Sequence, residues 1–142
     1  MTIMNKNVQF KMYADYHQHP ANRAIHAVIV PIITTSLLAH FPDKPLDYVQ
    51  VFLVCLYFLN YGGLIAVGMY QYFEVARFLS RQWRRNSSKW IQETILAFLT
   101  GWVLLFLGHY IEGSRPALLD APLDAIYYAP LHTSWGMFYE LE

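Results

Sequence analysis

The chain has 142 residues, no formal net charge, 56% apolar residues and 14% charged residues. A soluble domain carries about 25% charged residues, so this composition indicates an environment of lipid rather than water. A nucleic-acid-binding protein needs a basic surface to neutralise phosphates, and the balanced charge excludes nucleic acid as a partner. The length is typical of one domain, and we expect residues 1–142 to form a single membrane-embedded helical domain.

Four runs without charged residues follow one another along the chain, at residues 24–42, 48–73, 94–111 and 125–139. A membrane-spanning helix needs about 20 apolar residues. The second run is ample for one helix, the first and third are sufficient, and the fourth is short enough to be interfacial or buried in a bundle. We therefore predict an all-α fold, a multi-pass membrane helical bundle of about four apolar helices. Pro20 predicts an additional N-terminal helix that ends near Gln18.

A soluble all-α protein is the alternative, but residues 51–59, VFLVCLYFL, lack the polar face that a soluble helix needs. Residues 74–85, EVARFLSRQWRR, place apolar side chains on one helical face and arginines on the other. This pattern predicts an interfacial amphipathic helix in the plane of the lipid headgroups. An extension of the preceding helix is the alternative. We expect an integral membrane protein, in the cytoplasmic membrane if the source is bacterial or the endoplasmic reticulum if it is eukaryotic.

Six histidines stand out, since ionisable groups are costly in membrane helices. They are His17, His19, His26, His40, His109 and His132. We expect His19 and His40 at the water interface, and His132 to form an ordinary hydrogen bond near the end of the fourth run. The other three are more informative.

His17 and His26 flank Pro20, and Asn22 is a predicted N-cap for a helix that begins at Arg23, so a tight turn could bring the two imidazoles together. His109 and Glu112 are three residues apart and share a helical face. A metal site could use both side chains, or Glu112 could orient the imidazole.

Two other classes of protein remain open on spacing alone. Two histidines from different helices could ligate haem b in a membrane redox carrier. Alternatively, the histidines could satisfy helix ends in a non-enzymatic membrane scaffold. The sequence contains no phosphate-binding glycine loop, nucleophile elbow or His-Glu-x-x-His motif.

Residues 16–31, YHQHPANRAIHAVIVP, and 108–118, GHYIEGSRPAL, together resemble the 2-hydroxy fatty acid dioxygenase family. The family pattern has Tyr-His, Pro-x-Asn and Ile-His, and later Gly-His, a glutamate and Pro-Ala-Leu. The matching residues are His17, Pro20, Asn22, Ile25, His26, Pro31, Gly108, His109, Glu112, Pro116, Ala117 and Leu118. The resemblance covers about residues 10–130. Glu112 follows the Gly-His one residue earlier than in many members.

The resemblance implies a small multi-pass membrane enzyme that depends on Fe²⁺ and cleaves 2-hydroxy fatty acids with O₂, shortening the chain by one carbon. Three protein ligands would leave open positions on iron for a chelating 2-hydroxy carboxylate and O₂. The expected roles are metal binding by His17, His26 and His109, catalysis by Glu112, and substrate binding by Asn22 and Arg115. Membrane lipid would surround the protein, and a homo-oligomer is compatible with the sequence.

The shared metal site conflicts with full crossing of the first three runs. His26 lies near the start of the first run and His109 near the end of the third, so three crossings would separate them by about 25 Å. One run must therefore be broken, tilted or re-entrant. Pro31 makes the first run the best candidate, because it removes a helical hydrogen bond. We predict that a nitrogen of His109 lies within about 5 Å of one from His17 or His26.

Overall fold

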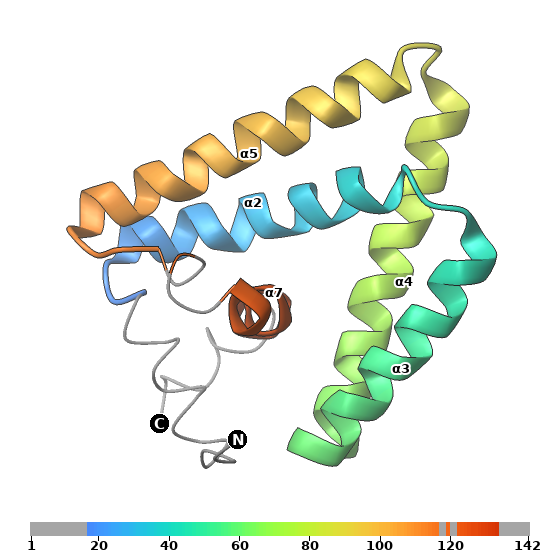
Figure 1. Cartoon of the computed structure of the whole chain (residues 1–142), viewed down its shortest axis with the longest axis horizontal. Coiled ribbons are helices and arrows are strands. Elements are labelled where there is room, and N and C mark those ends of the chain that lie inside the picture. Colours follow the sequence, from blue (N-terminus) through green and yellow to red (C-terminus); the bar gives the residue numbers. More distant parts are fainter. Residues whose placement is uncertain (1–16, 117–118, 120–121, 134–142) are drawn as a thin grey trace. The chain divides into compact units, whose positions relative to one another are not determined.

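The computed structural model describes residues 17–116, 119 and 122–133, and the elements in this part of the chain are all helices (Figure 1). They are α2 (Pro20–Leu38), α3 (Asp43–Tyr61), α4 (Gly63–Asn86), α5 (Trp90–Glu112) and α7 (Pro122–Leu131). The all-α prediction is confirmed for these residues. The predicted N-terminal helix lies outside them.

The chain divides into two compact units. Unit 1 contains residues 1–30 and 103–142, and unit 2 contains residues 31–102. Helices α2 and α5 each contribute one half to each unit. They are also the two described helices that are long and apolar enough to cross a membrane, and most of each is not buried. The predictions of a single domain and of four membrane-crossing runs stay predictions.

Helix α2 begins earlier, and continues further, than the sequence predicted. It starts at Pro20, which suits a first helical turn because the missing N–H would have no partner there. The N–H of Ala21 donates to Nδ1 of His19 at 3.1 Å, so His19 occupies the capping position that was predicted for Asn22. The predicted break at Pro31 is also wrong, since the helix runs through it to Leu38.

The long second run is two helices rather than one. It breaks at Gly62, whose φ of 88° and ψ of 179° are accessible to almost no other residue. The N–H of Gly62 donates to the carbonyl of Phe58 at 2.9 Å and closes the end of α3. Helix α4 then starts at once and packs back along α3. The chain therefore reverses in the middle of its longest uncharged run.

The predicted interfacial helix at residues 74–85 is the second half of α4. Arg77 does not face lipid headgroups but is buried in unit 2. Its Nη2 donates to Oδ1 of Asp47 at 2.5 Å and its Nη1 to Oε1 of Gln50 at 2.8 Å. Arg81 and Arg84 lie within 4 Å of Asp43. The arginines thus join α4 to the start of α3, which the helical pattern of one segment could not reveal.

The end of α2 and the start of α5 lie together in unit 2, where His40 Nε2 and the hydroxyl of Thr94 are 2.9 Å apart. The α3–α4 hairpin returns the chain from the first of these ends to the second. The start of α2 and the end of α5 then both belong to unit 1. The conflict over His26 and His109 is therefore resolved by the break in the second run, not in the first.

Replacing Gly62 with alanine should destabilise the protein by about 1–3 kcal/mol, because a side chain at that φ and ψ is strained. Gly63→Ala is the matched control. A Cβ there would meet only Phe58 at an ordinary 3.8 Å, so no stability should be lost. Denaturant unfolding in detergent micelles measures both variants. Equal stability would mean that the chain does not turn at Gly62.

Candidate metal centre

Three buried imidazoles meet in unit 1. One comes from the segment that precedes α2, one from α2 itself and one from the last turn of α5. One ring nitrogen from each of His17, His26 and His109 lies within 4.8 Å of the other two. The ring centroids of His17 and His26 are 4.4 Å apart, and each is 4.9 Å from that of His109. The proximity predicted for these residues is confirmed, whereas their role as ligands stays a prediction.

The donor set fits a divalent transition-metal ion. Imidazole nitrogens bind such ions at about 2 Å, so two nitrogens on one ion are at most about 4 Å apart. The three imidazoles would need to close by only about 1 Å. Nδ1 of His26 lies 3.0 Å from the carbonyl oxygen of Asn22, which can only accept, so this nitrogen carries the proton. Nε2 of His26 then presents its lone pair to an ion.

Glu112 accepts hydrogen bonds from the residues next to the imidazoles and not from the imidazoles themselves. Its Oε1 accepts hydrogen bonds from the backbone N–H groups of Gln18 and, at 3.1 Å, His19. Its Oε2 accepts a hydrogen bond from the side-chain amide of Asn22. Both backbone groups directly follow His17. The carboxylate therefore holds the segment that carries His17 against the end of α5.

Asn22 links the remaining two imidazoles to the same carboxylate. It is fully buried, its carbonyl accepts from His26, and its side-chain nitrogen lies 3.5 Å from Nδ1 of His109. The hydroxyl of Ser114 lies 3.3 Å from that same Nδ1. Gly108 permits this packing, because a Cβ there would overlap the side-chain oxygen of Asn22. The pattern Gly-His thus places a small residue beside Asn22 and the imidazole beside the other two.

His132, for which an ordinary hydrogen bond was predicted, lies at the edge of the same cluster. It is buried, and its ring centroid is 5.1 Å from that of His17. Burial, together with His17 and Arg23 nearby, lowers the pKa of His132 to about 4. Its imidazole is therefore neutral at physiological pH. No spacing pattern in the sequence connects the end of α7 with the other histidines, so sequence reasoning missed it.

The remaining residues with a predicted role do not contribute an imidazole to this cluster. Arg115 is exposed in the segment after α5, and no ion pair of Arg115 is found among the described residues. Its predicted binding of substrate stays a prediction, as does that of Asn22, whose burial and hydrogen bonds suit a role in positioning. His40 belongs to unit 2 and pairs with Thr94. The exposed His19 caps α2.

Replacing Gly108 with alanine should weaken metal binding by about 10- to 100-fold, the range expected when the partners of metal ligands are disturbed. The new methyl group would displace Asn22, which cannot move without losing its hydrogen bond to Glu112. Titration of metal-free protein with Co²⁺ measures the dissociation constant. An unchanged constant would mean that the packing at Gly108 does not influence the imidazoles.

The chain is similar to known dioxygenases over almost its entire length. Residues 4–140 match the family model described as 2-hydroxy-palmitic acid dioxygenase Mpo1-like. The 2-hydroxy-palmitic acid dioxygenase MPO1 of Saccharomyces cerevisiae is 28% identical over 150 aligned residues, which cover 98% of this chain and 83% of the yeast protein. No solved structure matches. Because the family model covers far more than half of its length, the chain belongs to the Mpo1-like 2-hydroxy-palmitic acid dioxygenase family.

Proposed function

We propose that this protein is a membrane dioxygenase that uses Fe²⁺ and O₂ to shorten 2-hydroxy fatty acids by one carbon. The observation that carries the proposal is the buried cluster of His17, His26 and His109, with one nitrogen of each within 4.8 Å of the others. The family supplies the class of substrate and of reaction. Three protein ligands are the arrangement that non-haem iron oxygenases use, because it leaves positions open for substrate and O₂.

The reaction balances with one O₂ and no external reductant. A 2-hydroxy acid with a chain of n carbons and O₂ give an acid of n − 1 carbons, CO₂ and water. The bond between C1 and C2 breaks. The substrate loses four electrons, and O₂ accepts the same four electrons. Bound iron would supply the activation of O₂. A 2-hydroxy carboxylate carries two oxygens that can chelate the ion, so a separate 2-oxo acid is not required.

The rest of the site would position these groups. Glu112 and Asn22 would hold the imidazoles in place through the hydrogen bonds described above. Arg115 is exposed and near the end of α5, where its planar guanidinium could pair with the substrate carboxylate. Burial of the three imidazoles would limit the access of water to a bound ion.

The apolar character of α2 and α5 supports a location in the bilayer. Both are long enough to cross, and large apolar side chains on them face outward, including Val28, Leu96 and Val103. A soluble core helix would bury such residues. A fatty acid substrate partitions into the same phase. We therefore propose an integral membrane enzyme that receives its substrate from lipid.

The haem carrier is less well supported than the dioxygenase. Axial imidazoles lie on opposite faces of a haem, with the macrocycle between them. The rings of His17, His26 and His109 are in mutual edge contact, with centroids 4.4–4.9 Å apart, which leaves no space for a porphyrin. A scaffold would not need three buried imidazoles together, because each is costly to bury.

Replacing His17, His26 or His109 singly with alanine should abolish both tight metal binding and chain shortening, because a three-ligand site cannot lose one. His40→Ala is the control, since this imidazole binds Thr94 in unit 2, and it should retain wild-type activity. His132→Ala should bind metal more weakly but still turn over substrate, as His132 is outside the set of three. Metal content and the yield of pentadecanoate from 2-hydroxyhexadecanoate are measured together.

Near-normal turnover in any one of the three variants would remove that residue from the ligand set. Inactivity of a folded His40→Ala variant would mean that the wrong histidines were chosen.

Substitutions at Glu112 and Asn22 test whether Glu112 positions the imidazoles or acts directly in catalysis. Glu112→Gln places an amide NH₂ against that of Asn22, and Asn22→Asp places two carboxylates together, so each should weaken Co²⁺ binding by about tenfold or more. The double variant restores a donor facing an acceptor. It should recover most of the affinity, and also the slow hydrogen exchange of the Gln18 and His19 amides in metal-free protein.

A double variant that binds metal as wild type but turns over no faster than Glu112→Gln would instead assign Glu112 a direct catalytic role. Failure to recover metal affinity would contradict the positioning role.

A further inference from the structure

Charge is confined to one end of the α3–α4 hairpin. Asp43, Lys44 and Asp47 lie at the start of α3, and the charged residues of α4 all lie in its second half, from Glu74 onward. Residues 48–73, which include the turn at Gly62, contain no charged residue. The hairpin therefore has a charged open end and an uncharged closed end.

Neither uncharged arm is long enough to cross a bilayer. Residues 48–61 of α3 and 63–73 of α4 extend for about 21 Å and 17 Å at 1.5 Å per residue. The hydrocarbon core of a bilayer is about 30 Å thick. Two full crossings would draw the charged open end into hydrocarbon, at a large energetic cost. Insertion of the hairpin to only part of that depth would leave its charged open end outside the hydrocarbon.

Arg77 is the arginine nearest the uncharged arms, and its charge is shielded from a surrounding apolar phase by burial and by hydrogen bonds. It is buried between the helices, and its two terminal nitrogens donate to Asp47 and Gln50. Arg85 and Lys89, further toward the open end, are exposed. Paired charges near the hydrocarbon and exposed charges away from it are the distribution expected at a membrane surface.

The turn between α3 and α4 can lie in hydrocarbon at reduced cost, because its one non-helical residue has both backbone polar groups hydrogen-bonded. It consists of one non-helical residue, Gly62. The N–H of Gly62 donates to the carbonyl of Phe58 at 2.9 Å, and its carbonyl accepts from the N–H of Ala66 at 3.2 Å. Irregular backbone at membrane depth is otherwise excluded by the cost of unpaired polar groups.

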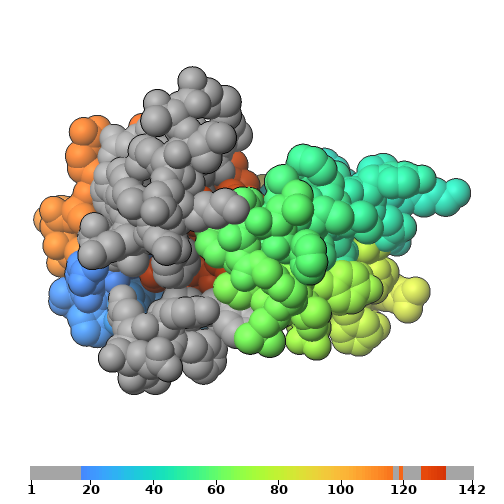
Figure 2. Space-filling model, turned by 90° about the horizontal axis from the view of Figure 1, so that it is seen from below, coloured from blue at the N-terminus to red at the C-terminus, as the bar shows by residue number. Residues whose placement is uncertain are grey.

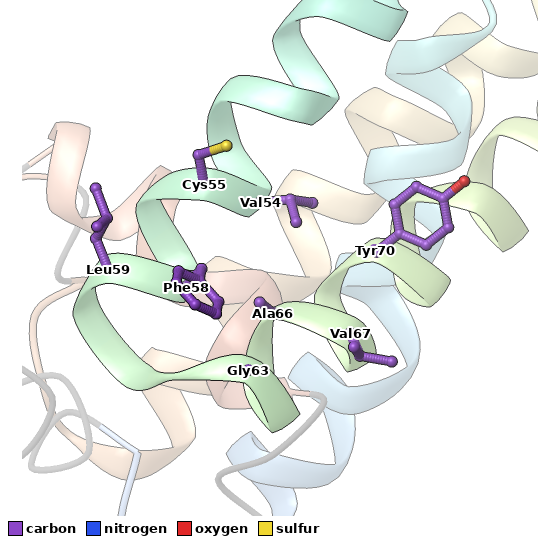
Figure 3. Close-up of a pocket in the computed structure, with 8 residues that line it drawn as sticks. All are labelled: Val54, Cys55, Phe58, Leu59, Gly63, Ala66, Val67 and Tyr70. Atoms are coloured by element: carbon purple, nitrogen blue, oxygen red, sulfur yellow. The ribbon is translucent and has the colours of Figure 1, made fainter.

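The surface around the turn suits acyl chains rather than water. Leu64 is 75% exposed and Leu59 is 70% exposed. A groove of about 550 Å³ lies between the two helices near the turn, and most of its lining side chains are apolar, with Tyr70 and Cys55 beside them (Figure 3). The outer surface of α3 and α4 is visible in green in Figure 2. The chains of bilayer lipids would bury the apolar area of this groove, which is unfavourable to leave in water.

We infer that α3 and α4 form a re-entrant hairpin, which enters the bilayer from one face, turns at Gly62 among lipid acyl chains and returns to the same face. The inference rests on the membrane location proposed above and not on the metal chemistry.

Single cysteines in a Cys55→Ser background test this inference in sealed vesicles made permeable with alamethicin, so that a water-soluble maleimide reaches both faces. Lys44→Cys and Arg85→Cys report the open end, and Leu59→Cys and Leu64→Cys the turn. Val103→Cys, on an exposed apolar position of α5, reports whether the protein is in the bilayer at all. Each variant must unfold at the same denaturant concentration as the parent in detergent micelles, which confirms its fold.

We expect rapid labelling of both open-end positions, and labelling of the two turn positions and of position 103 only after detergent dissolves the bilayer. In non-permeabilised vesicles, the two open-end positions should label to the same extent. Rapid labelling at the turn with position 103 protected would overturn the hairpin alone. Rapid labelling of both would overturn the membrane location as well.

Discussion

The hydrogen bond between the side chains of Asn22 and Glu112 joins residues 90 positions apart in sequence and fixes the start of α2 against the end of α5. The same carboxylate accepts from the backbone next to His17, and the carbonyl of Asn22 accepts from His26. His109 lies one turn before Glu112 on the same helix face. One carboxylate and one amide thus position three imidazoles from segments that are distant in the sequence.

The α3–α4 hairpin leaves from the C-terminal end of α2 and brings the chain back beside that end, where α5 begins. The break at Gly62 provides the return, because it divides an apolar run that could have crossed as one helix into two arms that fold back. The charged residues at the open end of that hairpin then pair with one another, with Arg77 in the centre. The backbone conformation at Gly62 therefore lets the end of α2 and the start of α5 lie together in unit 2.

The sequence predicted the helical class and the meeting of His17, His26 and His109, the latter through the family resemblance as much as through spacing. It did not predict the division of residues 48–73, because hydropathy does not distinguish one long apolar helix from two short ones. The partners of Glu112 include backbone N–H groups, and every residue but proline has one, so no pattern of side chains identifies them. His132 was missed since its approach to His17 depends on tertiary packing. The burial of Arg77 was missed for the same reason.

We propose that the three imidazoles hold a metal ion on which O₂ and a 2-hydroxy fatty acid react. The most direct test of this proposal is a titration of metal-free protein with Fe²⁺ under argon, followed by addition of 2-hydroxyhexadecanoate and a measured amount of O₂. Activity should rise with iron and saturate at one ion per chain, with one O₂ consumed and one CO₂ released for each pentadecanoate formed. Full turnover by protein free of metal, or iron bound without any consumption of O₂ in the presence of this substrate, would contradict the proposal.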